Sequence, residues 1–247
     1  MNYLAVVSYL GKAYKGFERQ LRYPTIQGKI EDSLSTLLGK KTKIHGAGRT
    51  DAGVNAKGQT FSFLSESPVS DQSHFVHALN RLLPEDIVVL SLRPVPPGFD
   101  ARHSSSGKVY SYSFHHGVRN VFAVDECQLE YPKFDFPLFM EAMKLFEGCH
   151  NFQNFTTKPE DKDHFIRTIS YVRFDYDEPS GHMKVTLKGN GFMTYMVRIM
   201  IGTAFKVAMG KMKSEKIVSL LEGGKRTIIS YKAPAEGLCL EEVIYDK

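Results

Sequence analysis

The residues best suited to chemistry lie at positions 46–56, in the run Gly-Ala-Gly-Arg-Thr-Asp-Ala-Gly-Val-Asn-Ala. A guanidinium, a hydroxyl and a carboxylate follow one another there, at Arg49, Thr50 and Asp51, among three glycines. Glycine permits backbone conformations and close approaches that other residues forbid, so such a loop can hold a carboxylate against a ligand. Asp beside glycine is also common in ordinary turns. Taken alone, the run is compatible with both a turn and a reactive site.

Arg198 is the second candidate, because it is the only charged residue between Asn190 and Phe205. A helix that is apolar all round is normally buried. An unpaired guanidinium there would cost several kcal/mol, on the order given for a buried ion, and arginine cannot lose its proton. We therefore expect a carboxylate or phosphate to meet Arg198. The partner is either a structural acid in the core or Asp51 in an active site, where the guanidinium would lower the pKa of Asp51 and keep it ionised.

Tyr110 and Tyr112 alternate in a predicted strand and therefore point to the same side of it. Core packing is expected for one of them. A tyrosine beside an RNA site could instead stack on a base. Arg102 lies shortly before this strand, where its side chain could pair with Asp100 or contact a phosphate.

Composition narrows the class of protein. The chain has 247 residues, of which 42% are hydrophobic and 24% charged, as in a globular protein of one large or two small domains. The net charge of +5 suits a polyanionic partner without proving one. Basic residues gather in four clusters, which fits an RNA-backbone surface: Lys12, Lys15, Arg19 and Arg22; Lys40, Lys41 and Lys43; Lys211, Lys213 and Lys216; Lys225 and Arg226.

Several functional classes find no support. The three cysteines form no CxxC pair, so neither a disulfide framework nor a zinc site is indicated, and reduced thiols favour the cytoplasm. No secretory signal is recognised, and no apolar run approaches the ~20 residues that a membrane span needs. Phosphate-binding loop, dinucleotide and GxSxG motifs are absent from the sequence. We expect no metal, no cofactor and no membrane association.

Hydrophobic periodicity predicts an α+β chain. Helices are expected after Thr25 and after Asp71, each of which can cap a first turn. Three more are expected over 137–146, 192–209 and 214–221. Strands are expected over 3–9, 42–45, 59–64, 87–92, 108–115, 168–176, 182–188 and 239–245. The proline-rich stretch 94–98 can be neither regular helix nor central strand, so we place a boundary there, between halves 1–98 and 99–247.

The run at 46–56 resembles the catalytic motif of the TruA-type tRNA pseudouridine synthases. Further segments similar to that family follow in the family's order along nearly the whole chain. They include Thr25-Ile26-Gln27, Leu83-Pro84-Glu85-Asp86-Ile87, Phe99-Asp100-Ala101-Arg102, Lys108-Val109-Tyr110-Ser111-Tyr112, His150-Asn151-Phe152, Arg167-Thr168-Ile169, the run from Gly189 to Arg198, and Ala233-Pro234-Ala235-Glu236-Gly237-Leu238. The glycine loop and the Met-Val-Arg helix are the most specific of these.

The resemblance implies two ferredoxin-like, or RRM-like, α/β halves with mainly antiparallel sheets joined into one and an active-site cleft between them. It implies a homodimer, without metal or cofactor, that converts uridine to pseudouridine at positions 38, 39 and 40 of the tRNA anticodon arm. By position, Asp51 would be the nucleophile, Tyr110 would stack on the base, and Arg198 would orient Asp51. Substrate-binding roles would fall to Arg49, Thr50, Arg102 and Lys108.

Two segments depart from the family pattern. Asn55 stands where many members carry His, and residues 16–20 replace a more usual Trp-containing segment in a chain without Trp. Both leave open which uridines are modified. Three alternatives remain: a non-catalytic RNA-binding protein that could dispense with Asp51, a synthase for another tRNA uridine, and an Asp-dependent hydrolase. The hydrolase would lack the expected second acid beside Asp51.

Overall fold

The computed structural model describes residues 1–118, 121, 127–129, 133–157, 165–227, 229 and 231–246. The chain forms two compact units: unit 1 comprises Met1–Ser106 and Cys239–Lys247, and unit 2 comprises Gly107–Leu238. The first segment of unit 1 runs past the 98/99 boundary expected from the prolines, and the last residues of the chain return to unit 1. Helices and mainly antiparallel strands mix in both units, which confirms the α+β class.

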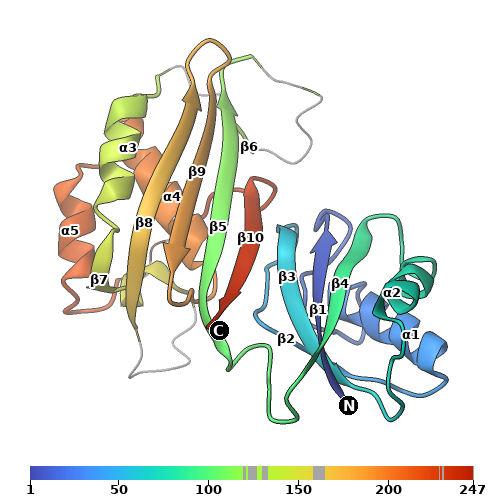
Figure 1. Ribbon diagram of the computed structural model, residues 1–247. Coiled ribbons are helices and arrows are strands. Elements are labelled where there is room, and N and C mark those ends of the chain that lie inside the picture. Colours follow the sequence, from blue (N-terminus) through green and yellow to red (C-terminus); the bar gives the residue numbers. More distant parts are fainter. Residues whose placement is uncertain are drawn as a thin grey trace. The chain divides into compact units, whose positions relative to one another are not determined.

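Unit 1 has the βαββαβ order of a ferredoxin-like fold. Its strands lie in the order β4-β1-β3, with β2 antiparallel to the end of β3 and β10 parallel to its start (Figure 1). The elements are β1 (Asn2–Tyr9), α1 (Ile26–Leu38), β2 (Ile44–Gly46), β3 (Asn55–Leu64), α2 (Gln72–Asn80), β4 (Ile87–Val95) and β10 (Leu238–Tyr245).

Both predicted helix caps of unit 1 are confirmed. The Thr25 hydroxyl accepts a hydrogen bond from the Gly28 N–H at 3.2 Å, and the Asp71 carboxylate accepts one from the His74 N–H at 2.9 Å. Helix α1 buries Ile26, Ile30 and Leu34 along one stripe, each contributing about 1.5–3 kcal/mol.

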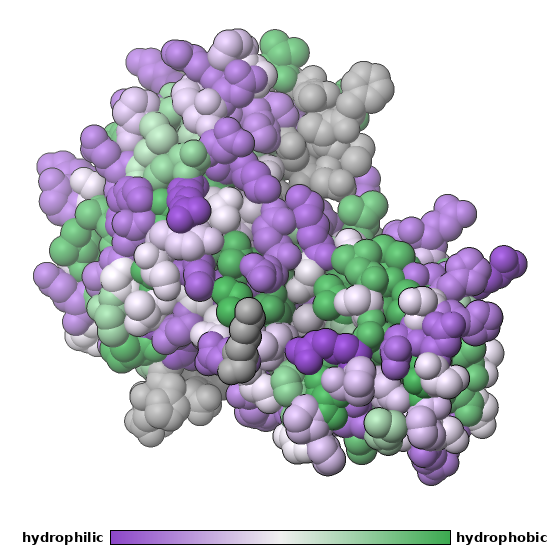
Figure 2. Space-filling model, viewed as in Figure 1, coloured by the Kyte–Doolittle hydropathy of each residue, from purple (hydrophilic) through white to green (hydrophobic). Residues whose placement is uncertain are grey.

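The two faces of the unit 1 sheet differ. One face packs aromatic side chains against the helices: Phe63 stacks on Tyr3 at 5.7 Å and on Phe75 of α2 at 6.3 Å between ring centroids. The other face is partly open, with hydrophobic surface over β1 and β4 (Figure 2) and Val88 and Leu90 40% and 54% exposed.

Unit 2 is built around the strand order β5-β9-β8-β7, all antiparallel, with β6 parallel to β5. Helices α3 and α4 pack on each other and cover one face (Figure 1). On that face Phe114 contacts Phe139 and Phe205 edge-on at 5.3 and 5.0 Å. The elements are β5 (Ser105–His116), β6 (Cys127–Leu129), α3 (Phe136–Lys144), β7 (Gly148–Asn151), the 3-10 turn η1 (Gln153–Phe155), β8 (Ile166–Asp177), β9 (His182–Gly189), α4 (Met196–Ala208) and α5 (Glu215–Leu221).

The starts of two predicted elements differ from the structure by four residues. Helix α4 begins at Met196 and not at 192, because Tyr195 adopts φ +62° and a left-handed residue cannot continue a right-handed helix. Strand β3 begins at Asn55 and not at 59, because β10 pairs with its first residues. That pairing joins segments more than 180 residues apart, and local sequence patterns carry no signal for it.

Candidate active site

Asp51 opens a tight turn in unit 1. Its carbonyl accepts a hydrogen bond from the Val54 N–H at 3.2 Å, and Gly53 has φ +80°, the positive angle that a type II turn needs at its third residue. Asp51 is half-buried, and it follows the buried Thr50. The turn interpretation of the sequence is therefore confirmed, and it is compatible with a reactive carboxylate at the start of the turn.

The backbone on both sides of Asp51 is anchored to β3. The Ala47 N–H donates to the Thr60 carbonyl at 2.9 Å. The side chain of Gln59, which is fully buried, donates to the Gly48 carbonyl at 3.0 Å. After the turn, the Asn55 carboxamide accepts from the Gly11 N–H at 2.8 Å. Asn55 is itself buried, so this departure from the family pattern braces the loop from the inside.

Two glycines outside the motif allow a second loop to lie directly against the turn. A Cβ built at Gly11 would lie 2.1 Å from the Val54 carbonyl oxygen. A Cβ at Gly16, which has φ +97°, would lie 2.9 Å from the Thr50 carbonyl oxygen and 3.3 Å from the Ala52 nitrogen. Only glycine fits at such separations, so the Asp51 turn rests on the backbone of residues 11–17.

Hydrogen bonds link that second loop to helix α1. The first-turn N–H groups of Ile26 and Gln27, which have no partner inside the helix, donate to the carbonyls of Gly16 and Phe17 at 3.2 and 2.8 Å. The Phe17 N–H in turn donates to the Thr50 carbonyl at 3.1 Å. A continuous chain of contacts thus runs from helix α1 to the residue that precedes Asp51.

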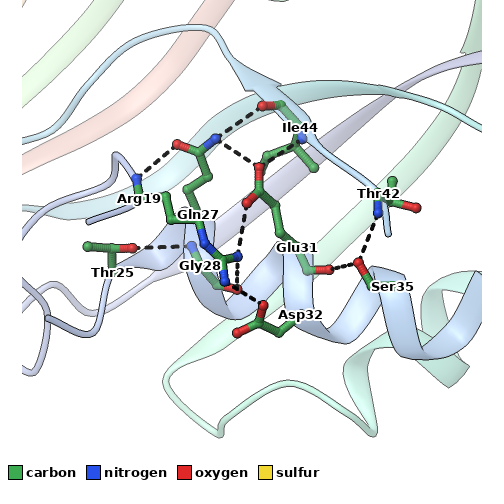
Figure 3. A network of polar contacts seen from close by, with 9 residues as sticks. All are labelled: Arg19, Thr25, Gln27, Gly28, Glu31, Asp32, Ser35, Thr42 and Ile44. Atoms are coloured by element: carbon green, nitrogen blue, oxygen red, sulfur yellow. Dashed lines mark hydrogen bonds and ion pairs between the residues drawn. The ribbon is translucent and has the colours of Figure 1, made fainter. Parts of the chain in front are cut away.

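Glu31 fixes this arrangement from within helix α1 (Figure 3). Its buried carboxylate accepts from the Arg19 guanidinium at 3.0 Å, from the Gln27 amide at 3.0 Å and from the Ile44 N–H at 3.1 Å. Arg19 also pairs with the exposed Asp32 at 2.9 Å. A buried carboxylate with three donors is well satisfied, and it joins helix α1, Arg19, which follows the second loop, and β2.

The predicted substrate-binding residues of unit 1 occupy different environments. The Arg49 guanidinium lies 3.1 Å from Glu18, with both side chains more than half exposed. The Thr50 hydroxyl lies 2.8 Å from the Tyr9 hydroxyl in the core. Arg102 is exposed. It contacts Asp100 through its backbone N–H, which donates to the Asp100 carboxylate at 2.9 Å.

The two tyrosines of β5 lie in unit 2, and both are buried. Tyr112 is fully buried, and its hydroxyl donates to the Pro234 carbonyl at 3.0 Å. Burial raises the pKa of the Tyr112 phenol well above its ordinary value. Tyr110 is 8% exposed, and its ring meets Phe192 edge-on at 5.1 Å. Of the pair, Tyr112 is the core residue, and Lys108, on the same strand, is half-buried.

Arg198 lies in the first turn of α4 and is held by the backbone of unit 2. Its Nε donates to the Ala233 carbonyl at 2.8 Å, while its own carbonyl accepts from the Ala233 N–H at 2.9 Å. Its guanidinium also lies 5.5 Å from the ring centroid of Tyr195. Arg198 is half-buried, whereas the sequence favoured full burial. A backbone carbonyl therefore meets part of the need for a partner that we assigned to a carboxylate or phosphate.

The structure brings Arg49, Thr50 and Asp51 together on one loop of unit 1, with Arg102 elsewhere in that unit, and places Lys108, Tyr110 and Arg198 in unit 2. Pairing of Asp51 with Arg198 stays a prediction. Sequence reasoning gave Tyr9 and Gly11 no part in the site, and it noted residues 16–20 as a departure from the family pattern without assigning Gly16 or Phe17 a contact with the Asp51 turn. Among the described residues, no group of three or more His, Cys, Asp or Glu could hold a metal ion, and no helix is long and apolar enough to cross a membrane.

The chain is similar to known proteins over its full length. A family model described as tRNA pseudouridine synthase matches residues 5–104 and 142–246. The tRNA pseudouridine synthase A of Streptococcus mutans is 35% identical over 249 residues, covering 100% of this chain and 99% of the relative. The protein of the same name from Acetivibrio thermocellus is 34% identical, covering 99% of each.

Solved structures are among the more distant matches. A chain in the crystal structure of the archaeal box H/ACA sRNP Nop10-Cbf5 complex is 14% identical with a TM-score of 0.40, and the match covers 82% of this chain and 44% of that one. The full-length relatives and the family model are decisive. They show that the chain belongs to the tRNA pseudouridine synthases, isomerases that convert uridine to pseudouridine in tRNA.

Proposed function

We propose that this synthase modifies uridines 38, 39 and 40 in the anticodon stem-loop of tRNA, with Asp51 as the nucleophile. The relatives that match over the full chain are tRNA pseudouridine synthases A, and the motif at 46–56 is the one that carries the catalytic Asp in the family it resembles. The observation that carries the proposal is the bracing of Asp51: its turn is fixed to β3 and to the glycines of a second loop.

The reaction must break the C1′–N1 bond of uridine, turn the uracil and join C1′ to C5. In one route the Asp51 carboxylate attacks C1′ and uracil departs through N1. C5 then bonds to C1′ and displaces the carboxylate, after which C5 loses its proton to a base and N1 takes up a proton, so product and substrate are isomers. Attack of Asp51 on C6 and removal of a 2′ proton are alternative routes. All three need an ionised carboxylate that is held still.

The remaining site residues take roles around Asp51. Tyr110 stacks on the uracil and accepts the C5 proton. Arg198, whose planar guanidinium is oriented by its Nε bond to Ala233, positions the Asp51 carboxylate. Arg49 exchanges its exposed partner Glu18 for the flipped nucleotide, whose unstacking costs a few kcal/mol. Arg102 and Lys108 contact the phosphate backbone.

A groove in unit 1 offers a contact surface for tRNA. It has a volume of about 890 Å³ and carries Lys40, Lys41, Lys43 and His45 in its lining. Three of these residues are lysines, of which Lys40 pairs with Glu66 in the same lining, and lysines suit a phosphate backbone, whose counterions are released on binding.

The enzyme acts in the cytoplasm as a homodimer, and light scattering coupled to gel filtration tests the dimer.

Tritium release from tRNA transcripts labelled at C5 of uracil tests the proposed chemistry. Wild-type protein should release tritium, and Asp51→Asn should release at least about 10³-fold less, as expected for loss of a nucleophile. Its affinity for tRNA should stay within about threefold, a difference below 1 kcal/mol. Asp32→Asn, which changes an exposed carboxylate on α1, is the matched control and should release tritium at the wild-type rate.

Transcripts in which cytidine replaces uridine at 38, 39 or 40 test the assigned positions. Each replacement should remove the tritium released from that position. Unchanged release from a transcript lacking all three uridines would assign the enzyme to another tRNA uridine. Activity retained in Asp51→Asn would overturn the nucleophile.

A further inference from the structure

The Thr50 side chain faces the core of unit 1. Thr50 is 6% exposed, and its hydroxyl lies 2.8 Å from the hydroxyl of Tyr9. Tyr9, the last residue of β1, is 3% exposed. Both hydroxyls therefore lie in the interior of unit 1. Thr50 directly precedes Asp51 in the chain, and Asp51 is the residue proposed to react with the nucleotide.

We propose that Tyr9 is a positioning residue for the reaction, acting on Asp51 through Thr50. The same assignment makes Thr50 a positioning residue, in place of the nucleotide contact expected from the sequence. The proposal rests on the proposed function of Asp51, and it adds a residue from outside the motif at 46–56.

Thr50 is held at two points, and together they fix the amide that leads into Asp51. The Tyr9 hydroxyl holds the side chain, and the Phe17 N–H holds the carbonyl at 3.1 Å. Because a peptide unit is planar, fixing the carbonyl of Thr50 also fixes the N–H and Cα of Asp51. The turn bond from Val54 to the Asp51 carbonyl then fixes the following peptide. The backbone of Asp51 is therefore set on both sides.

The phenol of Tyr9 suits this task. A neutral hydroxyl can donate one hydrogen bond and accept others, so it can pair with threonine in either direction. Burial raises the pKa of Tyr9 above its ordinary value, which keeps the proton in place. A phenylalanine would keep the ring in the core and remove the contacts of the hydroxyl with Thr50 and with the side chain of Gln59, which itself holds the Gly48 carbonyl of the same loop.

The expected effect falls on kcat. A displacement of about 1 Å in a reacting group can cost 10²-fold in rate, and loss of one of the two anchors of Thr50 should move Asp51 by less. We expect Tyr9→Phe to lower kcat about 10-fold and to change KM for tRNA less than about twofold, because Tyr9 is buried and does not meet the tRNA.

Tyr3→Phe is the matched control. Tyr3 lies on the same face of β1, is 1% exposed, and its hydroxyl bonds to the Val69 N–H at 2.8 Å, away from the Asp51 turn. Both variants remove one buried phenolic hydroxyl, so both should lower the urea midpoint of unfolding to a similar extent. Only Tyr9→Phe should lower kcat in the tritium-release assay, at a temperature where every variant is folded.

Substitutions at Thr50 separate positioning from general destabilisation. Thr50→Val removes the hydroxyl and should lower kcat as Tyr9→Phe does, whereas Thr50→Ser keeps it and should retain wild-type kcat. The Tyr9→Phe/Thr50→Val double variant should be no slower than Tyr9→Phe alone, because Tyr9→Phe already breaks the contact that Thr50→Val removes.

Equal kcat values for Tyr9→Phe and Tyr3→Phe would overturn the positioning role, as would multiplicative losses in the double variant. The proposed function fails by a different result: tritium release that persists in Asp51→Asn. The two failures are therefore distinguishable within one set of assays.

Discussion

Replacement of Gly16 by alanine tests whether the second loop sets the position of Asp51. Gly16 has φ +97°, and an added Cβ would lie 2.9 Å from the Thr50 carbonyl oxygen, 3.3 Å from the Ala52 nitrogen and 3.4 Å from the Asp51 carbonyl carbon. All three neighbours are backbone atoms of the turn. They cannot rotate away as the end of a flexible side chain could, so either residues 50–52 or the second loop must move.

The stability cost has two parts. A non-glycine residue in a left-handed conformation costs about 1–2 kcal/mol. Overpacking against fixed neighbours adds about 1–3 kcal/mol, so the free energy of unfolding should fall by about 2–5 kcal/mol. The turn should also move by a few tenths of an ångström, and since 1 Å can cost 10²-fold, kcat should fall about 10-fold.

Gly39→Ala provides the matched control, measured by urea unfolding and by tritium release. Gly39 has φ +65° at the end of α1, but nothing lies within 4 Å of its built Cβ. The control should therefore lose only the conformational term, about 1–2 kcal/mol, and keep wild-type kcat. The difference between the two variants measures the crowding of the Asp51 turn.

A Gly16→Ala variant that is destabilised but turns over at the wild-type rate would refute the reasoning. It would show that the second loop yields and that the turn holds Asp51 without it. Equal losses of stability in Gly16→Ala and Gly39→Ala would refute the close backbone approach itself.

Three further predictions address other contacts. Glu31→Gln leaves one of three donors without an acceptor and should lower the free energy of unfolding by about 1–3 kcal/mol in urea, against less than about 1 kcal/mol for the exposed Asp32→Asn. Gly202→Ala places a Cβ 2.6 Å from a carbonyl oxygen of the segment that binds Arg198, and it should lower kcat while tRNA affinity in filter binding stays unchanged. Burial raises the folded-state pKa of Tyr112, so its contribution to stability is complete below the unfolded pKa of about 10 and is lost above it; Tyr112→Phe should make the alkaline fall in unfolding free energy shallower by about 1.4 kcal/mol per pH unit.

The sequence predicted helices and strands well where their limits depend on residues close together in the chain. The caps Thr25 and Asp71 lie where the sequence placed them, because an N-cap depends on a side chain and an N–H three residues away. The start of α4 could not be predicted in this way. Residues 192–195 are largely apolar, like the helix itself, and tyrosine is not a residue type whose presence indicates the left-handed angle that Tyr195 adopts.

The same distinction between local and non-local signals applies to the candidate site. Reactive groups are visible in a sequence because their chemistry resides in the side chain, as for Asp51 and Arg198. The atoms that hold them are mostly backbone: the Thr50 carbonyl, the Phe17 N–H and the Ala233 carbonyl. Backbone groups are the same in every residue type, so only an indirect mark, such as a glycine where no side chain fits, shows where they are used.

This division explains why Arg198 needed reinterpretation. An isolated guanidinium in an apolar helix indicated that a partner must exist, because an unpaired buried charge costs free energy. That argument could not say whether the partner is a carboxylate, a phosphate or a backbone carbonyl. The Ala233 carbonyl, which accepts from Nε, satisfies part of that need. Because the guanidinium is planar, this bond also fixes the direction in which its two terminal nitrogens point. Such an arginine can serve the core and a carboxylate together. The structural and the active-site interpretations of Arg198 are therefore compatible.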